Sequence, residues 1–217
     1  MIRTNSEFDS GDTAFIALEQ YYAKNNITKP ISDRVYVDVG AGQPVFYSNS
    51  TKFRENGYKI VSIDAMPRNV KMFNNIGYDI LQYAVTETDD QTEVVFREYV
   101  DVIQGLSYST IAEIDDAKNE GTRGFRVSEY TVPAKSLKTI LKEHHPEVTS
   151  IDVLDVDTEG GEIGIMQGLD MKLYNPIILI VENMEENSKE FDKFYEDHGY
   201  VKFARCNHND VLVKTTN

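Results

Sequence analysis

The chain has 217 residues, of which 41% are apolar and 27% are charged, so it is long enough for one globular domain with a substantial core. Its net charge of −14 excludes the strongly basic surface that proteins need to wrap nucleic acid or to lie on anionic lipid. The single cysteine, Cys206, cannot form an internal disulfide, and the polar first residues contain no signal-like apolar run. We therefore expect a protein of the reducing cytoplasm, with neither nucleic acid nor membrane as a partner.

Helix-like and strand-like segments alternate along the first part of the chain. A helix is predicted over residues 13–25, with Asp12 or Thr13 as its cap. Strand–helix pairs follow, and each helix in them stops at a glycine, Gly57 or Gly77. The predicted strands cover residues 34–40, 58–65 and 78–85, and the predicted helices cover residues 49–57 and 67–77.

The alternation resumes after a different middle segment. There, strands at 92–100 and 125–133 flank a polar loop at 104–124, which is long for a compact domain and is typical of a lid or binding loop. The later elements again follow one another as strand and helix, and the last two strands form a hairpin. They are strand 149–157, helix 160–169, strand 176–183, helix 188–199, and the hairpin strands 200–206 and 210–215.

This order predicts an α/β fold. We expect a mostly parallel sheet with an antiparallel C-terminal hairpin and helices on both faces. Residues 1–217 are predicted to form a single domain, with an N-terminal helical extension at 1–33 and, at 93–133, inserted strands and a loop that are a candidate lid for the acceptor. Ligands of such sheets bind beyond the carboxyl ends of the strands. The polar residues at those ends are therefore the candidates for function.

The turn after the first strand carries only half of a dinucleotide-binding pattern. Gly40 and Gly42 give G-x-G, but Val45 stands where the next glycine would be. Asp64 follows Gly40 by 24 residues, close to the spacing of about 20 residues at which an acid binds ribose hydroxyls. These features favour a nucleoside without a diphosphate, and S-adenosylmethionine meets that description, with Asp38 as a partner for its ammonium group. The two glycines alone would equally fit a structural turn without a cofactor.

Several short sequence elements follow one another in a characteristic order. They are "DVGAGQPVFYSNST", "SIDAMP", "AVT", "GLSYST", "VPAKSLKTIL", "DVDTEGGEIGIMQG" and "IILIVEN". In their order and spacing they resemble the FkbM-type S-adenosylmethionine-dependent methyltransferases over nearly the whole chain. Three positions depart from that pattern: Asp64 replaces the more frequent Glu, Ala65 replaces a Pro, and Asp155 stands where Lys or Ser is common.

The resemblance implies a Rossmann-like class I methyltransferase sheet. It also implies methyl transfer, most often to a hydroxyl oxygen of a sugar, polyketide or other small metabolite. The methionine end of the cofactor would lie on the first turn, the ribose on Asp64 and the adenine near Tyr83, a residue that would equally suit the core. The predicted cofactor-binding residues are Asp38, Gly40, Ala41, Gly42, Gln43, Asp64, Ala65, Tyr83 and Ala84.

Acids at two later strand ends are the candidates for catalysis. A hydroxyl acceptor must lose a proton, and Asp157 and Glu159 are the first candidate bases. The alternative for Glu159 and for Glu162 is a capping role, since acids are favoured at helix N-termini. Asp157, Glu182 and Asn183 could also hold magnesium. Alternatively, Glu182 and Asn183 bond only backbone and water.

Two other functions remain open at this level. One is a cofactor-binding protein that keeps the methyltransferase fold without catalysis. The other is methylation of a nucleic acid ribose, against which the lack of Lys and Arg runs argues. The sequence names neither the small-molecule acceptor nor the oligomeric state.

Overall fold

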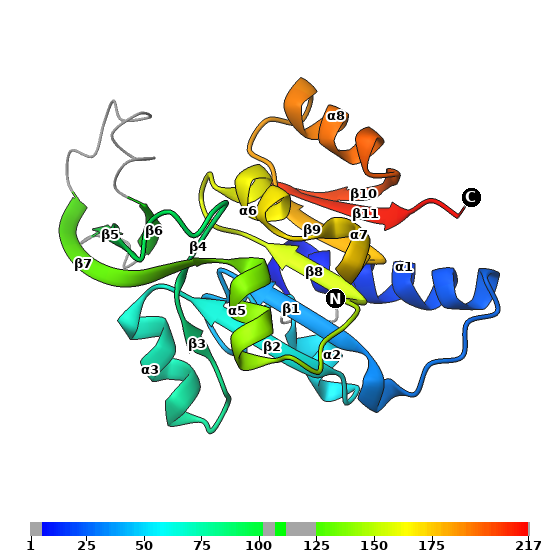
Figure 1. The fold of residues 1–217 in the computed structure, drawn as a ribbon, viewed down its shortest axis with the longest axis horizontal. Helices are drawn as coiled ribbons and strands as arrows, with labels where there is room; N and C mark the ends of the chain where they lie inside the picture. Colours follow the sequence, from blue (N-terminus) through cyan, green and yellow to red (C-terminus); the bar gives the residue numbers. More distant parts are fainter. Residues whose placement is uncertain (1–5, 102–106, 112–124, 217) are drawn as a thin grey trace.

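The computed structural model of the protein describes residues 6–101, 107–111 and 125–216. At its centre is a seven-stranded sheet with the order β10-β11-β9-β8-β1-β2-β3 (Figure 1). The strands are β1 (Val35–Val39), β2 (Lys59–Asp64), β3 (Leu81–Gln82), β8 (Val153–Val156), β9 (Ile178–Glu182), β10 (Tyr200–Cys206) and β11 (Asn209–Lys214). From β3 to β9 neighbouring strands are parallel, whereas β11 runs antiparallel to both β9 and β10. The predicted α/β fold with an antiparallel C-terminal hairpin is confirmed.

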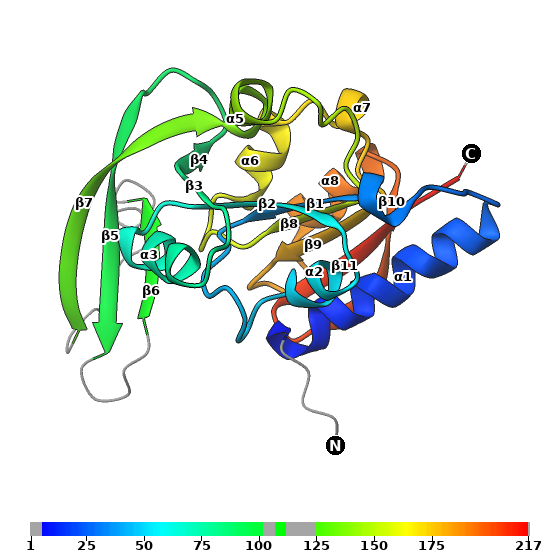
Figure 2. The same cartoon turned by 90° about the horizontal axis from the view of Figure 1, so that it is seen from below.

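Helices lie on both faces of this sheet (Figure 2). On one face are α1 (Ser10–Lys24) and α2 (Thr51–Glu55); on the other are α5 (Leu137–His144), α6 (Glu162–Gly168), α7 (Met171–Tyr174) and α8 (Lys189–Asp197). α3 (Pro67–Asn75) lies near the β3 edge (Figure 1). Among the described residues, none of the helices is both long and apolar enough to cross a membrane.

The alternation of side chains along β1 divides the core in two. Tyr36 packs with Leu18 and Phe53 on the α1 face, whereas Val37 packs with Ile140 on the opposite face. Successive side chains of a strand point to opposite faces, so a central strand covered by helices on both sides is buried throughout. All five residues of β1 are buried accordingly.

A second, four-stranded sheet has the order β4-β7-β5-β6. It consists of β4 (Ala84–Thr86), β5 (Glu93–Asp101), β6 (Ser107–Ile111) and β7 (Phe125–Ser136), and it lies at the left of the molecule, away from α1 and the C-terminus (Figure 1). The single strand predicted at 78–85 is therefore wrong, because the chain passes from the main sheet to the second sheet after Gln82. Of the predicted loop at 104–124, residues 107–111 form β6, and the remainder lies outside the described residues.

The N-terminal helix begins earlier than predicted, at Ser10. Its N-cap is Asp9, not Asp12 or Thr13, and Asp12 instead accepts a hydrogen bond from the Ser6 hydroxyl at 3.0 Å. A short 3₁₀ turn, η1 (Glu7–Asp9), precedes the helix.

The side chain of Asn49 fixes this turn. Its Oδ1 accepts the N–H groups of Glu7 and Gly11 at 3.1 and 3.2 Å. A Cβ at Gly11 would lie 2.3 Å from the carbonyl oxygen of Asn49, so only glycine permits this approach. The start of α1 is thus joined to the loop that follows β1.

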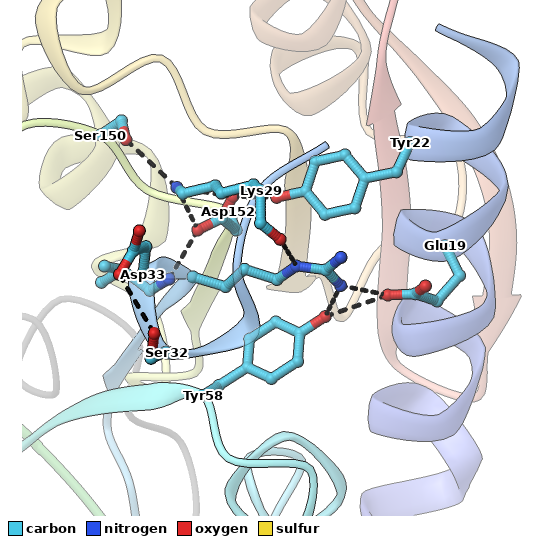
Figure 3. A network of polar contacts seen from close by, with 10 residues as sticks. Glu19, Tyr22, Lys29, Ser32, Asp33, Tyr58, Ser150 and Asp152 are labelled. Atoms are coloured by element: carbon cyan, nitrogen blue, oxygen red, sulfur yellow. Dashed lines mark hydrogen bonds and ion pairs between the residues drawn. The ribbon is translucent and has the colours of Figure 1, made fainter. Parts of the chain in front are cut away.

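A polar network joins α1 to the amino ends of β1 and β8 (Figure 3). At its centre the buried carboxylate of Asp152 accepts hydrogen bonds from the Tyr22 hydroxyl, from Lys29 Nζ at 2.8 Å and from the Val35 N–H at 2.5 Å. Beside it Arg34 donates to the Tyr58 hydroxyl at 2.8 Å. This network lies at the edge of the sheet opposite to the one at which ligands are expected, and we assign it to stability.

Candidate functional site

A cavity of about 670 Å³ lies at the carboxyl ends of β1, β2 and β8. Its volume is within the range of about 300–1,000 Å³ that is usual for small-molecule sites. Most of the predicted cofactor-binding residues and both candidate bases line it; these are residues 40–43, Asp64, Ala65, Tyr83, Ala84, Asp157 and Glu159. Asp38, Glu182 and Asn183 are not part of the lining.

The glycine turn is shaped by the close approach of two strand ends. Gly40 has a φ of +83°, and a Cβ there would lie only 1.7 Å from the carbonyl oxygen of Asp157. The N–H groups of Gly40 and Ala41 both donate to the carbonyl oxygen of Ile63, at 2.9 and 3.1 Å. Glycine is therefore required where the ends of β1, β2 and β8 converge on the cavity.

Asp64 is buried at the end of β2 and makes several hydrogen bonds within the protein. Its Oδ2 accepts from the Gly42 N–H at 2.8 Å and from Asn69 Nδ2 at 3.0 Å, and its Oδ1 accepts from the Met66 N–H at 2.7 Å. Burial raises its pKa, and these hydrogen bonds oppose the rise. A carboxylate has about four acceptor sites, so Oδ1 retains capacity for one ligand hydroxyl.

Asp38 is buried in β1 and does not line the cavity. The Ser50 hydroxyl donates a hydrogen bond to it, but its Oδ2 has no hydrogen-bond partner among the described residues. Burial raises the pKa of Asp38 to about 6, although Ser50 and the charge of Arg54 act in the opposite direction. Because Asp38 is not among the residues that line the cavity, the cavity does not support its predicted contact with the cofactor.

Asp155 is the cross-strand neighbour of Asp38. The two residues are paired in the register of β1 and β8, and the Tyr36 hydroxyl donates to Asp155 Oδ2 at 2.6 Å. Burial, and then the charge of Asp38, raise the pKa of Asp155 well above its usual range. Two adjacent buried carboxyls cannot both ionise easily. The surroundings of Asp155 thus favour its neutral, protonated form over a second charge in the core.

Asp157 and Glu182 form a carboxyl pair at the ends of β8 and β9. Burial, and then the charge of Glu182, raise the pKa of Asp157 well above its usual range. Burial, followed by the charges of Glu159 and Glu162, raises the pKa of Glu182 to about 8, and a hydrogen bond to Asp157 opposes this rise. Two carboxyls in hydrogen-bond contact share a proton. Asp157 is the member of the pair that lines the cavity.

Asn183 makes its side-chain contacts elsewhere. Its Nδ2 donates to Asp210 Oδ2 at 2.9 Å, and its Oδ1 accepts the Glu185 N–H at 3.1 Å. Across the described part of the chain, no group of three or more His, Cys, Asp or Glu side chains is arranged to hold a metal ion. Of the three predicted magnesium ligands, only Asp157 and Glu182 are side by side.

The two glutamates after Asp157 have different surroundings. Glu162 Oε1 accepts hydrogen bonds from the Thr158 and Gly160 N–H groups, at 3.1 and 2.8 Å, so this side chain closes the loop at the start of α6. Glu162 is thus the acid in the first turn of α6, but its hydrogen bonds hold the preceding loop and do not cap the N–H groups of the helix. Glu159 is exposed, has a φ of +60° and lines the cavity.

Other lining residues escaped the sequence analysis. Glu7 and Phe8 come from the N-terminal turn, Tyr47 from the loop after β1, Arg68 from α3 and Phe96 from the second sheet. Tyr47 lies within the sequence element that contains the glycine turn, and Arg68 directly follows the element that ends in Pro67. Glu7, Phe8 and Phe96 are brought to the cavity by long-range packing, for which the sequence gives no local signal.

Comparison with known proteins gives one family and a structural relative. The model of the methyltransferase FkbM domain matches residues 38–202, which is most of the chain. One similar solved structure is the crystal structure of methyltransferase FkbM from Methylobacillus flagellatus KT, with a TM-score of 0.47 and 11% sequence identity. That similarity covers 96% of this chain and 55% of the other, so this chain spans about half of that protein's length. No curated protein matches the sequence significantly.

Proposed function

Because the chain belongs to the FkbM methyltransferase family, we propose that it transfers a methyl group from S-adenosylmethionine to a hydroxyl of a small metabolite, sugar or polyketide-like acceptor. The observation that carries this proposal is the cavity, in which the glycine turn, Asp64 and Asp157 meet at the carboxyl ends of three strands. Such an edge is where open α/β sheets bind nucleosides.

The cavity lining offers suitable surroundings for the adenine, the ribose and the methionine end of the cofactor. Ala84, Val85 and Ile165 give one part of the wall an apolar surface that suits a purine ring. Asp64 retains an acceptor position for a ribose hydroxyl, and Gly42 has no atom within 3.4 Å of a Cβ position, which leaves room beside the turn. S-adenosylmethionine, once bound, supplies a methyl group that is already activated on a sulfonium. Asp38 would act indirectly, through the Ser50 loop beneath the turn.

Asp157 is the base that we assign to the acceptor hydroxyl. It faces the cavity, and its hydrogen bond with Glu182 places a shared proton directly behind it. Burial and the neighbouring carboxyl of Glu182 raise the pKa of Asp157, which strengthens it as a proton acceptor, and such general-base catalysis contributes about 10²–10⁴-fold. Alignment of the acceptor with the methyl group would contribute at most about 7–11 kcal/mol. Glu159 stays a second candidate from the exposed side of the cavity.

The inserted segment supports an acceptor site on the same side. Phe96, from residues 93–133, forms part of the cavity wall. We therefore propose one methyltransferase domain in which the second sheet borders the acceptor. The net charge of −14 argues against a nucleic acid in this position.

Calorimetric titration with S-adenosylmethionine and S-adenosylhomocysteine tests cofactor binding. Transfer of a labelled methyl group to a panel of hydroxylated metabolites, with magnesium or with a chelator, then tests the reaction and the metal. Asp157→Asn should lower turnover by about 100-fold or more while the affinity for S-adenosylhomocysteine stays close to wild type. Asp79→Asn, which changes an exposed acid, serves as the control. Lack of cofactor uptake would overturn the proposal; uptake without turnover on the whole panel would favour a non-catalytic binding protein.

A further inference from the structure

Three large side chains of the cavity wall have an unusual backbone conformation. Phe8, Tyr47 and Glu159 all lie in the left-handed region, with φ values of 45°, 53° and 60°. The other described non-glycine residues with positive φ are Asp9, which adjoins Phe8, and three asparagines, a residue type that adopts this conformation readily. Strained residues persist mainly where function fixes the direction of a side chain. Because these residues are concentrated in the cavity wall, we infer that this wall has a binding function.

Two of these residues present aromatic rings at the cavity. Phe8 is 48% exposed and Tyr47 is 73% exposed, although both line the cavity. Large rings that stay in solvent at the wall of a cavity provide surface for a ligand. Ring faces also attract organic cations within about 6 Å of the ring centre.

The charged residues of the cavity wall also favour a cationic ligand. Carboxylates of Glu7 and Glu159 line the cavity in addition to Asp64. Among the described lining residues Arg68 is the single Lys or Arg, and its Nη1 lies 2.9 Å from Glu98 Oε1. An anionic acceptor would meet repulsion here, whereas a cation would be attracted.

The N-terminal part of this wall is held from two sides. Asn49 accepts the Glu7 N–H, and Asn209 Nδ2 donates to Glu7 Oε2 at 3.1 Å. The ring of Phe8 meets His208 edge to face, with 6.2 Å between ring centres. Glu7 and Phe8 also lie outside residues 38–202, to which the family match is confined. The family match therefore does not cover these two residues.

We propose that Glu7, Phe8, Tyr47 and Glu159 form a subsite for a positively charged group of the acceptor, a protonated amine or a quaternary ammonium. The inference rests on the proposed function, since it needs part of the cavity to hold an acceptor beside the cofactor. It narrows the acceptor to a hydroxylated compound that carries an amine or a quaternary ammonium group.

Three phenols of similar size test the charge preference. They are tyramine, 4-ethylphenol and 3-(4-hydroxyphenyl)propionate, which are cationic, neutral and anionic. Each is titrated into the full chain saturated with S-adenosylhomocysteine, so that the cofactor's own groups are already in place. We expect tyramine to bind at least about tenfold more tightly than the anion, and Glu7→Gln and Phe8→Ala each to weaken tyramine binding by about three- to tenfold.

The controls are Glu196→Gln and Phe203→Ala, which change an exposed acid and an exposed ring outside the cavity lining. Both should bind tyramine as the wild type does. Equal binding of the three phenols, failure of tyramine to bind, or an equal loss of S-adenosylhomocysteine affinity in Glu7→Gln and Phe8→Ala would overturn the inference. Cofactor uptake without this charge preference would leave the proposed function intact. If no cofactor is taken up, the proposed function fails, and the same series in the cofactor-free cavity still decides the charge preference.

Discussion

The amide group of Gly42 donates a hydrogen bond to Oδ2 of Asp64 over 2.8 Å, so the acid at the end of β2 holds the turn that follows β1. Asn69 and the Met66 amide complete the set of donors around the same carboxylate. Asp64 therefore lines the cavity and also holds the glycine turn, which forms the neighbouring part of the cavity wall. Its substitution should change the shape of the cavity as well as one ligand contact.

Asp64→Asn should weaken both stability and cofactor binding. The new NH₂ group would face N–H donors, and a buried donor without an acceptor costs about 1–3 kcal/mol. We expect a fall in the free energy of unfolding of that size, measured by urea denaturation, and at least about a tenfold loss of S-adenosylhomocysteine affinity by calorimetry. The exposed Asp79→Asn should leave both unchanged. Wild-type affinity in a folded Asp64→Asn protein would contradict this role.

Gly40→Ala should destabilise the protein strongly. The new Cβ would lie 1.7 Å from the backbone oxygen of Asp157, and backbone cannot move aside as a flexible side chain can. Gly77→Ala is the matched control, because Gly77 also has a positive φ, of +76°, but no atom lies within 4 Å of its Cβ position. The control isolates the conformational cost of about 1–2 kcal/mol, and Gly40→Ala should lose clearly more in urea denaturation. Equal losses would mean that the strand ends separate easily.

The stability of the protein should depend on Glu182 between about pH 5 and pH 8. Burial raises the pKa of Glu182 to about 8, so the folded state keeps a proton that the unfolded chain loses near its ordinary pKa of about 4.3. The contribution is present at low pH and is lost as the pH rises towards the folded pKa, by at most about 1.4 kcal/mol per pH unit.

Urea denaturation at several pH values across this range checks the effect. The unfolding free energy of wild type should fall more steeply with rising pH than that of Glu182→Gln, which has no proton to lose. Glu196→Gln, at an exposed position on α8, should follow the wild type. Parallel curves for wild type and Glu182→Gln would show that Asp157 carries the proton instead.

Asn49→Ala should release the N-terminal turn. The N–H groups of Glu7 and Gly11 would lose their shared acceptor, so we expect a loss of about 1–3 kcal/mol and faster hydrogen exchange of the amides at residues 7–12. Mass spectrometry of peptic peptides would measure the exchange. Asn74→Ala, at an exposed position on α3, is the control and should leave exchange at the turn unchanged.

Sequence patterns predicted best the elements whose structure is local. The hairpin strand at 200–206 matches β10 at both ends, and the mostly parallel sheet followed from the alternation of strands with helices. The split of residues 78–85 could not be predicted, because an apolar run does not say which of two sheets it joins. α7, of only four residues, is held by the Asp170 side chain on the Leu173 N–H and has no periodic pattern.

The predicted site residues divide in the same way. The turn, Asp64 and Asp157 follow from the rule for strand ends. The orientation of the Asp38 side chain could have been predicted. Asp38 lies two residues after Tyr36, so both side chains point to the same face of the sheet, and that face packs against α1. Glu7 and Phe8 reach the cavity only through the tertiary contacts of Asn49 and Asn209, which leave no local pattern in the chain.

The place of β11 between β9 and β10 has a practical consequence for anyone who would shorten the protein. An expression fragment cut at residues 38 and 202 would keep the whole family match and still remove this strand, along with α1 and the hydrogen bond from Tyr22 to Asp152. The remaining edge of β9 would expose unpaired backbone groups that invite aggregation. The limits of sequence similarity are therefore narrower than the limits of the unit that folds.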